Sequence, residues 1–240
     1  MAKGIFITGT DTGVGKTVAA SALARLISLK GVKVGIMKPV TSGCIERNDS
    51  LVSEDAELLA WGAGIENVTP DMAPYLLREP LAPSEAASRD GVRIDVSGIR
   101  DAYRRLEEQH DFVIVEGAGG LMVPLAGGLL IADLITTLNL PALVVTRPNL
   151  GTINHTLLTT FAARQMGISV TGIIINSYPS EPDAVESYAP HLLGSLAGAP
   201  ILGVFPKIEE RDLHLLVEKL AEATLHHPLT RFLLKELCID

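Results

Sequence analysis

Short, wholly apolar runs alternate with amphipathic stretches along the chain. Because polar residues do not interrupt them, these runs are typical of strands buried on both faces of a sheet. They fall at residues 4–8, 32–37, 112–115, 141–146, 171–175 and 201–205, with a shorter one near 75–77. Strands and helices alternating in this way predict an α/β fold, with a doubly wound, mainly parallel sheet of about seven strands and helices on both faces.

Apolar residues three or four positions apart predict the helices between these strands. An alanine-rich helix is expected at residues 16–30, and Gly31 suits its carboxyl end. Ser53 suits the amino-terminal cap of a second helix. Residues 63–92 hold four prolines and predict mostly loop. Further helical patterns fall at residues 96–110, 131–138, 153–167 and from 212 onward.

The glycine-rich stretch GTDTGVGKT, residues 9–17, lies between the first strand and the first helix. Free backbone N–H groups in such a turn, with the positive end of the helix dipole, bind phosphate. Lys16 is placed to reach the β- and γ-phosphates of a nucleotide, and the Thr17 hydroxyl to hold Mg²⁺. Thr10 stands where the strict P-loop pattern has its first glycine, so with Gly9 as the first glycine the spacer is one residue too long. The stretch still predicts a P-loop NTPase-like nucleotide site.

Polar residues follow several of the predicted strands. Ligands of an open parallel sheet bind beyond the carboxyl ends of its strands, so these residues are candidates. Glu116 follows an apolar strand as a Walker B acid does, which makes it a candidate Mg²⁺ ligand. Lys38 and Ser42 in KPVTSG suit an anion site, and Asn176 can hydrogen-bond a purine edge. Asp55 lies in a first helical turn, where acids are common for dipole reasons, so this pattern leaves its metal contact open.

Composition and charge narrow the class of protein. With 47% hydrophobic and only 4% aromatic residues, the chain suits helices packed on a sheet of Val, Ile and Leu. A formal net charge of −8 argues against nucleic-acid or anionic-membrane partners. Two cysteines give no disulfide framework, and neither a signal peptide nor a membrane span is expected. We therefore expect a cytoplasmic protein of one domain over residues 1–240, ending in a helical tail at 211–240.

Seven stretches together resemble the dethiobiotin synthetase family. KPV-x-SG and VEGAGG are the more specific of them, and the long spacer of the phosphate loop is the family's usual form. Members often carry Ser-Pro-His after a Glu-Pro near residue 80, whereas residues 81–84 here are LAPS, so no role is carried over for that histidine. The matching stretches are GTDTGVGKT (9–17), KPVTSG (38–43), DA (55–56), VEGAGG (115–120), LGTINHTLLT (150–159), IIINSY (173–178) and GVFP (203–206).

The resemblance implies one activity, which belongs to biotin biosynthesis. The family uses Mg-ATP and CO₂ to close the cyclic urea of dethiobiotin on 7,8-diaminononanoate, through a carbamate and a carbamic–phosphoric anhydride. ATP yields ADP and phosphate. The resemblance also implies a homodimer with its active sites at the interface.

The resemblance further implies roles for individual residues. Lys16 and Lys38 act on the phosphate and the carbamate. Mg²⁺ binding falls on Thr17, Asp55 and Glu116. Nucleotide binding falls on Gly13, Val14, Gly15, Lys16, Thr17, Val18, Asp55, Glu116, Gly117, Ala118, Gly119, Asn176, Ser177, Pro206, Lys207 and Ile208. Substrate binding falls on Thr12, Ser42, Gly151, Thr152, Asn154 and Tyr188.

Two other classes remain as alternatives. A partitioning ATPase of the ParA/MinD kind carries a lysine five residues before Lys16, in KGGxGKT, but Asp11 stands there in this chain. The acidic composition also lacks a basic surface for DNA. The synthetase domain of a cobyrinate amidating enzyme shares the fold, but it normally comes with a glutaminase domain, for which 240 residues leave no room.

Overall fold

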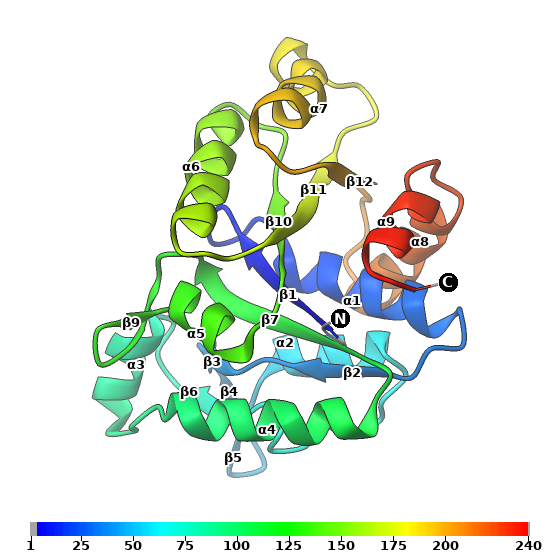
Figure 1. Cartoon of the computed structure of the whole chain (residues 1–240). Helices are drawn as coiled ribbons and strands as arrows, with labels where there is room; N and C mark the ends of the chain where they lie inside the picture. Colours follow the sequence, from blue (N-terminus) through cyan, green and yellow to red (C-terminus); the bar gives the residue numbers. More distant parts are fainter. Residues whose placement is uncertain (1–3, 240) are drawn as a thin grey trace.

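A central sheet of six parallel strands organises the protein. The computed structural model describes residues 4–239, so the domain expected over residues 1–240 extends beyond them at both ends. Figure 1 shows the sheet, whose strand order is β12-β11-β10-β1-β7-β2. The strands are β1 (Gly4–Gly9), β2 (Val34–Met37), β7 (Phe112–Gly120), β10 (Ala142–Thr146), β11 (Val170–Tyr178) and β12 (Ile201–Pro206). Each pairing within the sheet is parallel, as the wholly apolar runs predict.

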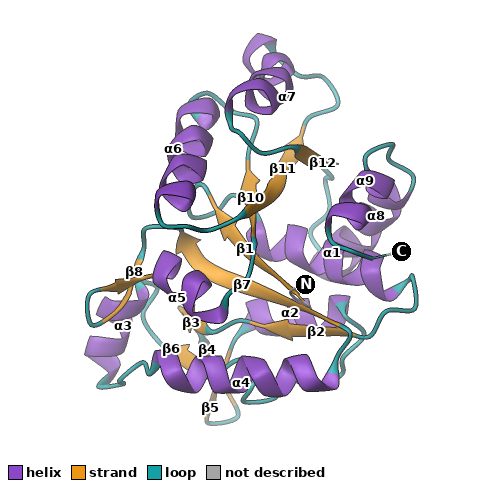
Figure 2. Cartoon of the chain, viewed as in Figure 1, coloured by secondary structure: helices purple, strands orange, loops and turns teal. Residues whose placement is uncertain are grey.

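Helices cover both faces of this sheet (Figures 1 and 2). One face carries α1 (Lys16–Ser28), α2 (Glu54–Gly62) and α8 (Leu213–Leu225), which pack against one another. The other face carries α4 (Val96–Gln109), α5 (Ile131–Leu138) and α6 (Thr152–Gln165), with α7 (Ala184–Leu196) beside α6. The expected helical tail is two helices, α8 and then α9 (Thr230–Glu236), which packs near β12. The predicted doubly wound α/β fold is confirmed.

The predicted count of about seven strands in the sheet is wrong by one. The short strand near residues 75–77 exists as β6 (Tyr75–Leu77), but it pairs with β3 (Val40–Ser42) in a separate parallel pair. Pro39 lies between β2 and β3 and has no N–H to continue the ladder, so the chain leaves the central sheet there. The Lys38 N–H donates instead to the Met72 carbonyl, at 2.7 Å.

Two further segments carry more structure than the sequence pattern predicts. The polar segment at residues 41–48 contains β4 (Ile45–Arg47), which forms a hairpin with β5 (Ser50–Val52). Its two turn residues, Asn48 and Asp49, have φ of 52° and 59°, as a type I′ turn requires. Residues 63–92 also hold α3 (Pro83–Asp90), because proline is tolerated at the start of a helix. A second hairpin joins β8 (Pro124–Ala126) to β9 (Leu129–Leu130).

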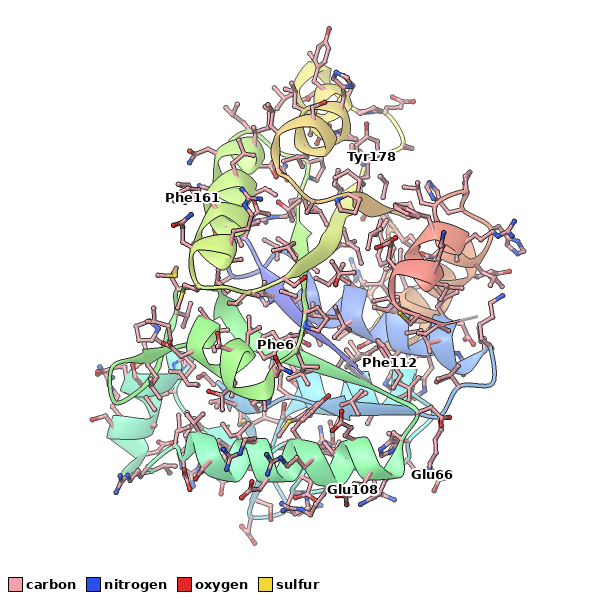
Figure 3. The ribbon with its side chains drawn as sticks, in the orientation of Figure 1. Phe6, Glu66, Glu108, Phe112, Phe161 and Tyr178 are labelled. Carbon is pink, nitrogen blue, oxygen red and sulfur yellow. The ribbon has the colours of Figure 1, made fainter. Side chains whose placement is uncertain are left out.

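The core lies between the sheet and its two helical layers. Phe6 of β1 is fully buried there, whereas Phe161 points from α6 toward the solvent and is 55% exposed (Figure 3). None of the helices within residues 4–239 combines the length and the apolar character that crossing a bilayer requires. The carboxyl ends of β1, β7 and β2 lie side by side, so the loops that follow them can form one site.

Candidate active site

The loop between β1 and α1 presents backbone N–H groups to an open cleft. Gly13 and Gly15 have φ of 73° and 81°, which residues with a Cβ rarely adopt. Gly15 is the N-cap of α1 and supplies no side-chain cap, so the first N–H groups of the helix stay available for a ligand. The Lys16 ammonium donates to the Asp11 carbonyl at 3.2 Å, which folds the lysine back over the loop. This arrangement suits the binding of a phosphate.

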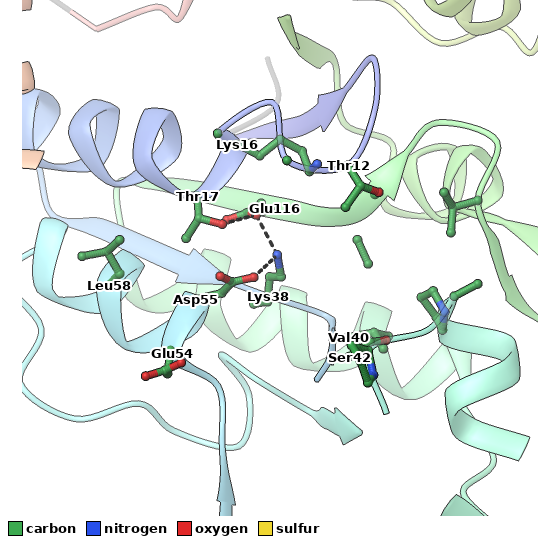
Figure 4. A pocket seen from close by; sticks show the side chains of 18 of the residues that line it. Thr12, Lys16, Thr17, Lys38, Val40, Ser42, Glu54, Asp55, Leu58 and Glu116 are labelled. Atoms are coloured by element: carbon green, nitrogen blue, oxygen red, sulfur yellow. Dashed lines mark hydrogen bonds and ion pairs between the residues drawn. The ribbon is translucent and has the colours of Figure 1, made fainter. Parts of the chain in front are cut away.

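A buried lysine lies between two carboxylates beside this loop, as Figure 4 shows. The Lys38 ammonium lies 2.6 Å from Glu116 Oε1 and 2.8 Å from Asp55 Oδ2. Thr17, in the first turn of α1, donates its hydroxyl to Glu116 Oε1 at 2.9 Å. Four segments thus meet here: α1, the end of β2, the start of α2, and β7.

The burial of these charges shifts their pKa values. Lys38 and Glu116 are only 4% and 1% exposed, whereas Asp55 is half-buried. Burial opposes the charge on Lys38, but the Glu116 and Asp55 carboxylates outweigh it and raise the pKa of Lys38. Burial, with the nearby Asp55 charge, raises the pKa of Glu116 against the opposing pull of Lys38. Burial also lowers the pKa of Lys16. The buried charge of Lys38 is therefore stabilised by its ion pairs with Glu116 and Asp55.

The first turn of α2 aims Asp55 at this cluster. Ser53 caps the helix as predicted, because its side chain accepts a hydrogen bond from the Ala56 N–H at 3.0 Å. The same hydroxyl lies 2.7 Å from the hydroxyl of Thr41 on β3, and both groups are buried. Burial opposes the charge on Asp55, yet the Lys38 ammonium outweighs it, and the pKa of Asp55 lies below its usual range. Strand β3 and the cap together fix where this carboxylate points.

The oxygen atoms present suit a magnesium ion with a nucleotide. Glu116 Oε2 and Ser42 Oγ are buried without a hydrogen-bond partner among residues 4–239, and such orphaned atoms favour a ligand that satisfies them. With Thr17 and Asp55, Glu116 gives an all-oxygen set of the kind that Mg²⁺ prefers. The described residues contain no group of three or more His, Cys, Asp or Glu arranged for a metal. Water and phosphate oxygens would therefore complete the coordination, as is usual for Mg²⁺.

A cleft of about 840 Å³ gathers many of the predicted residues. Its lining combines the phosphate loop, the lysine–carboxylate cluster and the glycine-rich end of β7. The predicted residues that line it are Thr12, Gly13, Gly15, Lys16, Thr17, Val18, Lys38, Ser42, Asp55, Glu116, Ala118 and Gly119.

The remaining predicted residues lie outside this lining, in three places. Val14 and Gly117 are buried behind it, and the carbonyl of Val14 accepts a hydrogen bond from Asn176 at 3.0 Å. The neighbouring ends of β11 and β12 and the residues after β12 hold Asn176, Ser177, Pro206, Lys207 and Ile208. The start of α6 and the exposed side of α7 hold Gly151, Thr152, Asn154 and Tyr188.

Several residues that line the cleft escaped the sequence analysis. They are mostly apolar, and they come from β3, α2, the segment before α3 with the first residue of that helix, the segment after β7, and the start of α8. A single apolar residue in a helix or loop gives no sign of facing a ligand, so no pattern could have found them. They are Val40, Glu54, Leu58, Pro80, Leu81, Ala82, Pro83, Val123 and Leu213.

The chain is similar to known proteins over most of its length. A protein-family model described as an AAA domain matches residues 3–213. The ATP-dependent dethiobiotin synthetase BioD of Bacillus licheniformis is 43% identical over 208 residues, which cover 87% of each chain. The protein of the same name from Thermodesulfovibrio yellowstonii is 42% identical over 218 residues, which cover 88% of this chain and 91% of that one.

A solved structure shares the architecture at low identity. The ParA family ATPase from Chlorobium tepidum TLS matches with a TM-score of 0.58 and 15% identity, and the match covers 99% of each chain. At that identity the likeness shows the fold alone, a parallel sheet between helical layers of the P-loop NTPase kind.

Proposed function

The chain belongs to the ATP-dependent dethiobiotin synthetase family, and from this premise we propose its substrates and the residues that act on them. The protein is an ATP-dependent ligase of biotin biosynthesis that uses Mg²⁺ with ATP. Its substrates are 7,8-diaminononanoate and CO₂, which it joins and closes into the cyclic urea of dethiobiotin. The observation that carries this proposal is the buried Lys38 between two carboxylates beside a phosphate-binding turn.

The reaction needs no nucleophile from the protein. One amine of the substrate adds to CO₂ and loses a proton, which gives a carbamate. A carbamate oxygen attacks the γ-phosphorus of ATP and ADP leaves. The second amine then attacks the carbonyl of this mixed anhydride, loses its proton and displaces phosphate. Such steps depend mostly on positioning and on stabilising negative charge, which suits lysines and backbone N–H groups.

The residues of the cleft divide these tasks. The backbone of residues 13–18 cradles the phosphates, with Ala118, Gly119 and the buried Gly117 beside it. Lys16 and Lys38 stabilise charge on the transferring phosphoryl group and the carbamate. Thr17, Asp55 and Glu116 hold Mg²⁺, which neutralises phosphate charge when bound. Thr12 and Ser42 contact the reacting end of the diamine. These assignments draw support from the shared cleft and from the orphaned oxygens of Glu116 and Ser42.

The nucleotide base belongs at the ends of β11 and β12. Asn176 carries both a donor and an acceptor for a purine edge, and its amide already contacts the phosphate loop through Val14. Ser177 has a φ of 58°, which turns the chain away at the end of the strand. Pro206, Lys207 and Ile208 flank the same place, because the Lys207 N–H donates to the Tyr178 carbonyl at 2.7 Å.

The far end of the diamine is a carboxylate, and we assign it to a second subunit. The start of α6 has an uncapped N-terminus that suits an anion, with Gly151, Thr152 and Asn154 around it, yet none of them lines the cleft of its own chain. Large apolar side chains on α6, just before it and on α7 are exposed, which suits an interface between subunits. These are Leu150, Leu158, Phe161 and Tyr188. The protein therefore works as a homodimer in which α6 of one subunit completes the other's site.

Turnover with labelled bicarbonate tests the proposal. With the diamine, Mg-ATP and ¹³C-bicarbonate, the label should enter the ureido carbonyl of the product. ATP hydrolysis that ignores the diamine and gives no labelled product would favour a switch ATPase of the ParA/MinD kind instead. The cytoplasmic location and the single domain over residues 1–240 stay predictions.

A further inference from the structure

Four threonine hydroxyls meet in the interior between the phosphate loop and α6. We call Thr10, Thr146, Thr152 and Thr156 the threonine cluster. Thr146, the last residue of β10, lies at its centre and is 1% exposed. Its hydroxyl oxygen lies 3.2 Å from that of Thr10, 3.0 Å from that of Thr156 and 2.7 Å from that of Thr152. One side chain thus ties the start of the phosphate loop to the start of α6.

The hydrogens and lone pairs of the four hydroxyls fix the direction of these hydrogen bonds. A hydroxyl has one hydrogen to donate and two lone pairs to accept with. Thr10 and Thr156 both donate to Thr146, which fills both lone pairs of the Thr146 oxygen. The bond between Thr146 and Thr152 fits either direction on geometry alone. Because Thr146 can accept no third hydrogen, it must donate its own hydrogen to Thr152.

This direction leaves one hydrogen without an acceptor. Thr152 accepts from Thr146, so its own hydroxyl hydrogen must point elsewhere. The Thr152 hydroxyl has no other hydrogen-bond partner among residues 4–239, although the residue is only 7% exposed. Thr152 begins α6 directly after Gly151, whose φ of 93° leaves the helix without a side-chain cap. The unused hydrogen therefore lies at the uncapped helix start.

We infer that Thr146 is a positioning residue that turns Thr152 into a hydrogen-bond donor for the substrate carboxylate. The inference rests on the proposed function, which places that carboxylate at the start of α6. A carboxylate only accepts hydrogen bonds, so a donor with a fixed orientation matches it. Thr146 touches neither the substrate nor the nucleotide, and its effect reaches the substrate through Thr152.

Replacing Thr146 by valine tests this directly. Thr146→Val keeps the shape of the side chain and suits a strand, but removes the central hydroxyl. We expect the KM for the diamine to rise about tenfold, as when a hydrogen bond to a charged group is lost, with kcat and the KM for ATP unchanged. Thr152→Val should give the same rise. The double variant should be no worse than either single one, because both remove the same interaction.

Two further variants separate positioning from a general loss of packing. Thr146→Ser restores the hydroxyl and should restore the KM for the diamine. Thr160→Val is the matched control, since Thr160 is buried in the same helix but donates only to the Leu157 carbonyl. Its KM for the diamine should stay at the wild-type value. If Thr146→Val does not fold, Thr146→Ala carries the same expectation.

The possible failures are distinct. A wild-type protein that turns over the diamine, with an unchanged KM in Thr146→Val, overturns this inference and leaves the proposed function standing. Equal changes in kcat and in both KM values, or a double variant whose rise is the product of the two single rises, also overturn it. A wild-type protein with no turnover of the diamine overturns the proposed function, and this inference with it.

Discussion

At the scale of single residues, the proposed chemistry depends on a cation that lies between two acids. Lys38 is almost fully buried, and such a charge is tolerable only because Glu116 and Asp55 pair with it. Glu116 keeps one oxygen without a partner among the described residues, so the pairing leaves room for a ligand. Mg²⁺ held by these carboxylates would neutralise their charge, and Lys38 would then be available to stabilise the transferring group.

Lys38→Ala should lower kcat strongly while leaving ATP binding nearly intact. The variant removes a charge that acts on the transition state, a loss typically worth about 3–4 kcal/mol. Steady-state kinetics with the diamine and nucleotide titration measure the two effects separately. Lys33→Ala is the control, because Lys33 is exposed. A kcat within a few-fold of wild type would show that Lys38 is not part of the chemistry.

Glu116→Gln should weaken the response of activity to Mg²⁺ or abolish turnover. The amide keeps the size of the side chain but offers a poorer ligand to a hard cation. Activity measured across Mg²⁺ concentrations at saturating ATP reveals the shift. Glu57→Gln, on the exposed side of α2 where it pairs with Arg47, should titrate like the wild type. An unchanged titration in Glu116→Gln would remove Glu116 from the metal site.

At the scale of elements, the start of α2 connects stability with catalysis. Ser53 caps the helix and meets Thr41 of β3, while Asp55 points from the same turn to Lys38. Ser53, which ends the loop before α2, therefore also fixes the direction of Asp55, a proposed metal ligand. At the start of α4, Asp95 caps the helix by accepting from the Ser97 N–H, but it does not line the cleft.

Ser53→Ala should lower both stability and activity. Loss of an N-cap costs about 1 kcal/mol in the free energy of unfolding, and the buried Thr41 hydroxyl loses its partner as well. Because Asp55 loses its fixed direction, kcat should fall too. Asp95→Ala is the matched control: it should cost about as much stability through its own cap but leave kcat unchanged. Denaturant unfolding measures the stability of both variants, and steady-state kinetics measure their kcat. Equal kcat values in the two variants would show that the cap at Ser53 does not affect catalysis.

At the scale of the whole molecule, the proposed binding residues of one chain fall in two separate places, and only one of them lines the cleft of that chain. The phosphate loop and Lys38 line the cleft, whereas the start of α6 and Tyr188 do not. The exposed apolar residues around α6 explain this division if a second subunit covers them. Each active site would then combine the phosphate half of one subunit with the carboxylate half of the other.

Mixing two inactive variants tests the shared site. Lys16→Ala should disable the phosphate half, and Thr152→Trp should block the carboxylate half by bulk, so each homodimer should be nearly inactive. After subunit exchange, a mixed dimer regains one intact site from its unmutated halves, and activity should return. Light scattering or native mass spectrometry monitors the exchange of subunits and provides the control. Confirmed exchange without any return of activity would place the whole site within one chain.

The sequence by itself determined the fold class, the phosphate loop and the places along the chain where candidate polar side chains follow strands. Wholly apolar runs specify strands buried on both faces, and the glycines at residues 13 and 15 are required by backbone angles that the turn adopts. The cap at Ser53 followed from local hydrogen bonding alone. Such features depend on neighbours in the chain, so a pattern can reveal them.

Only the tertiary structure decided which of these groups meet. The pairing of Lys38 with both Asp55 and Glu116 joins residues up to 78 positions apart, and no spacing in the sequence encodes it. Pairing partners of strands are equally non-local, which is why β6 was predicted correctly as a strand but placed in the wrong sheet. The threonine cluster arises for the same reason, because parallel strands bring Thr10 and Thr146 to one edge although 136 positions separate them.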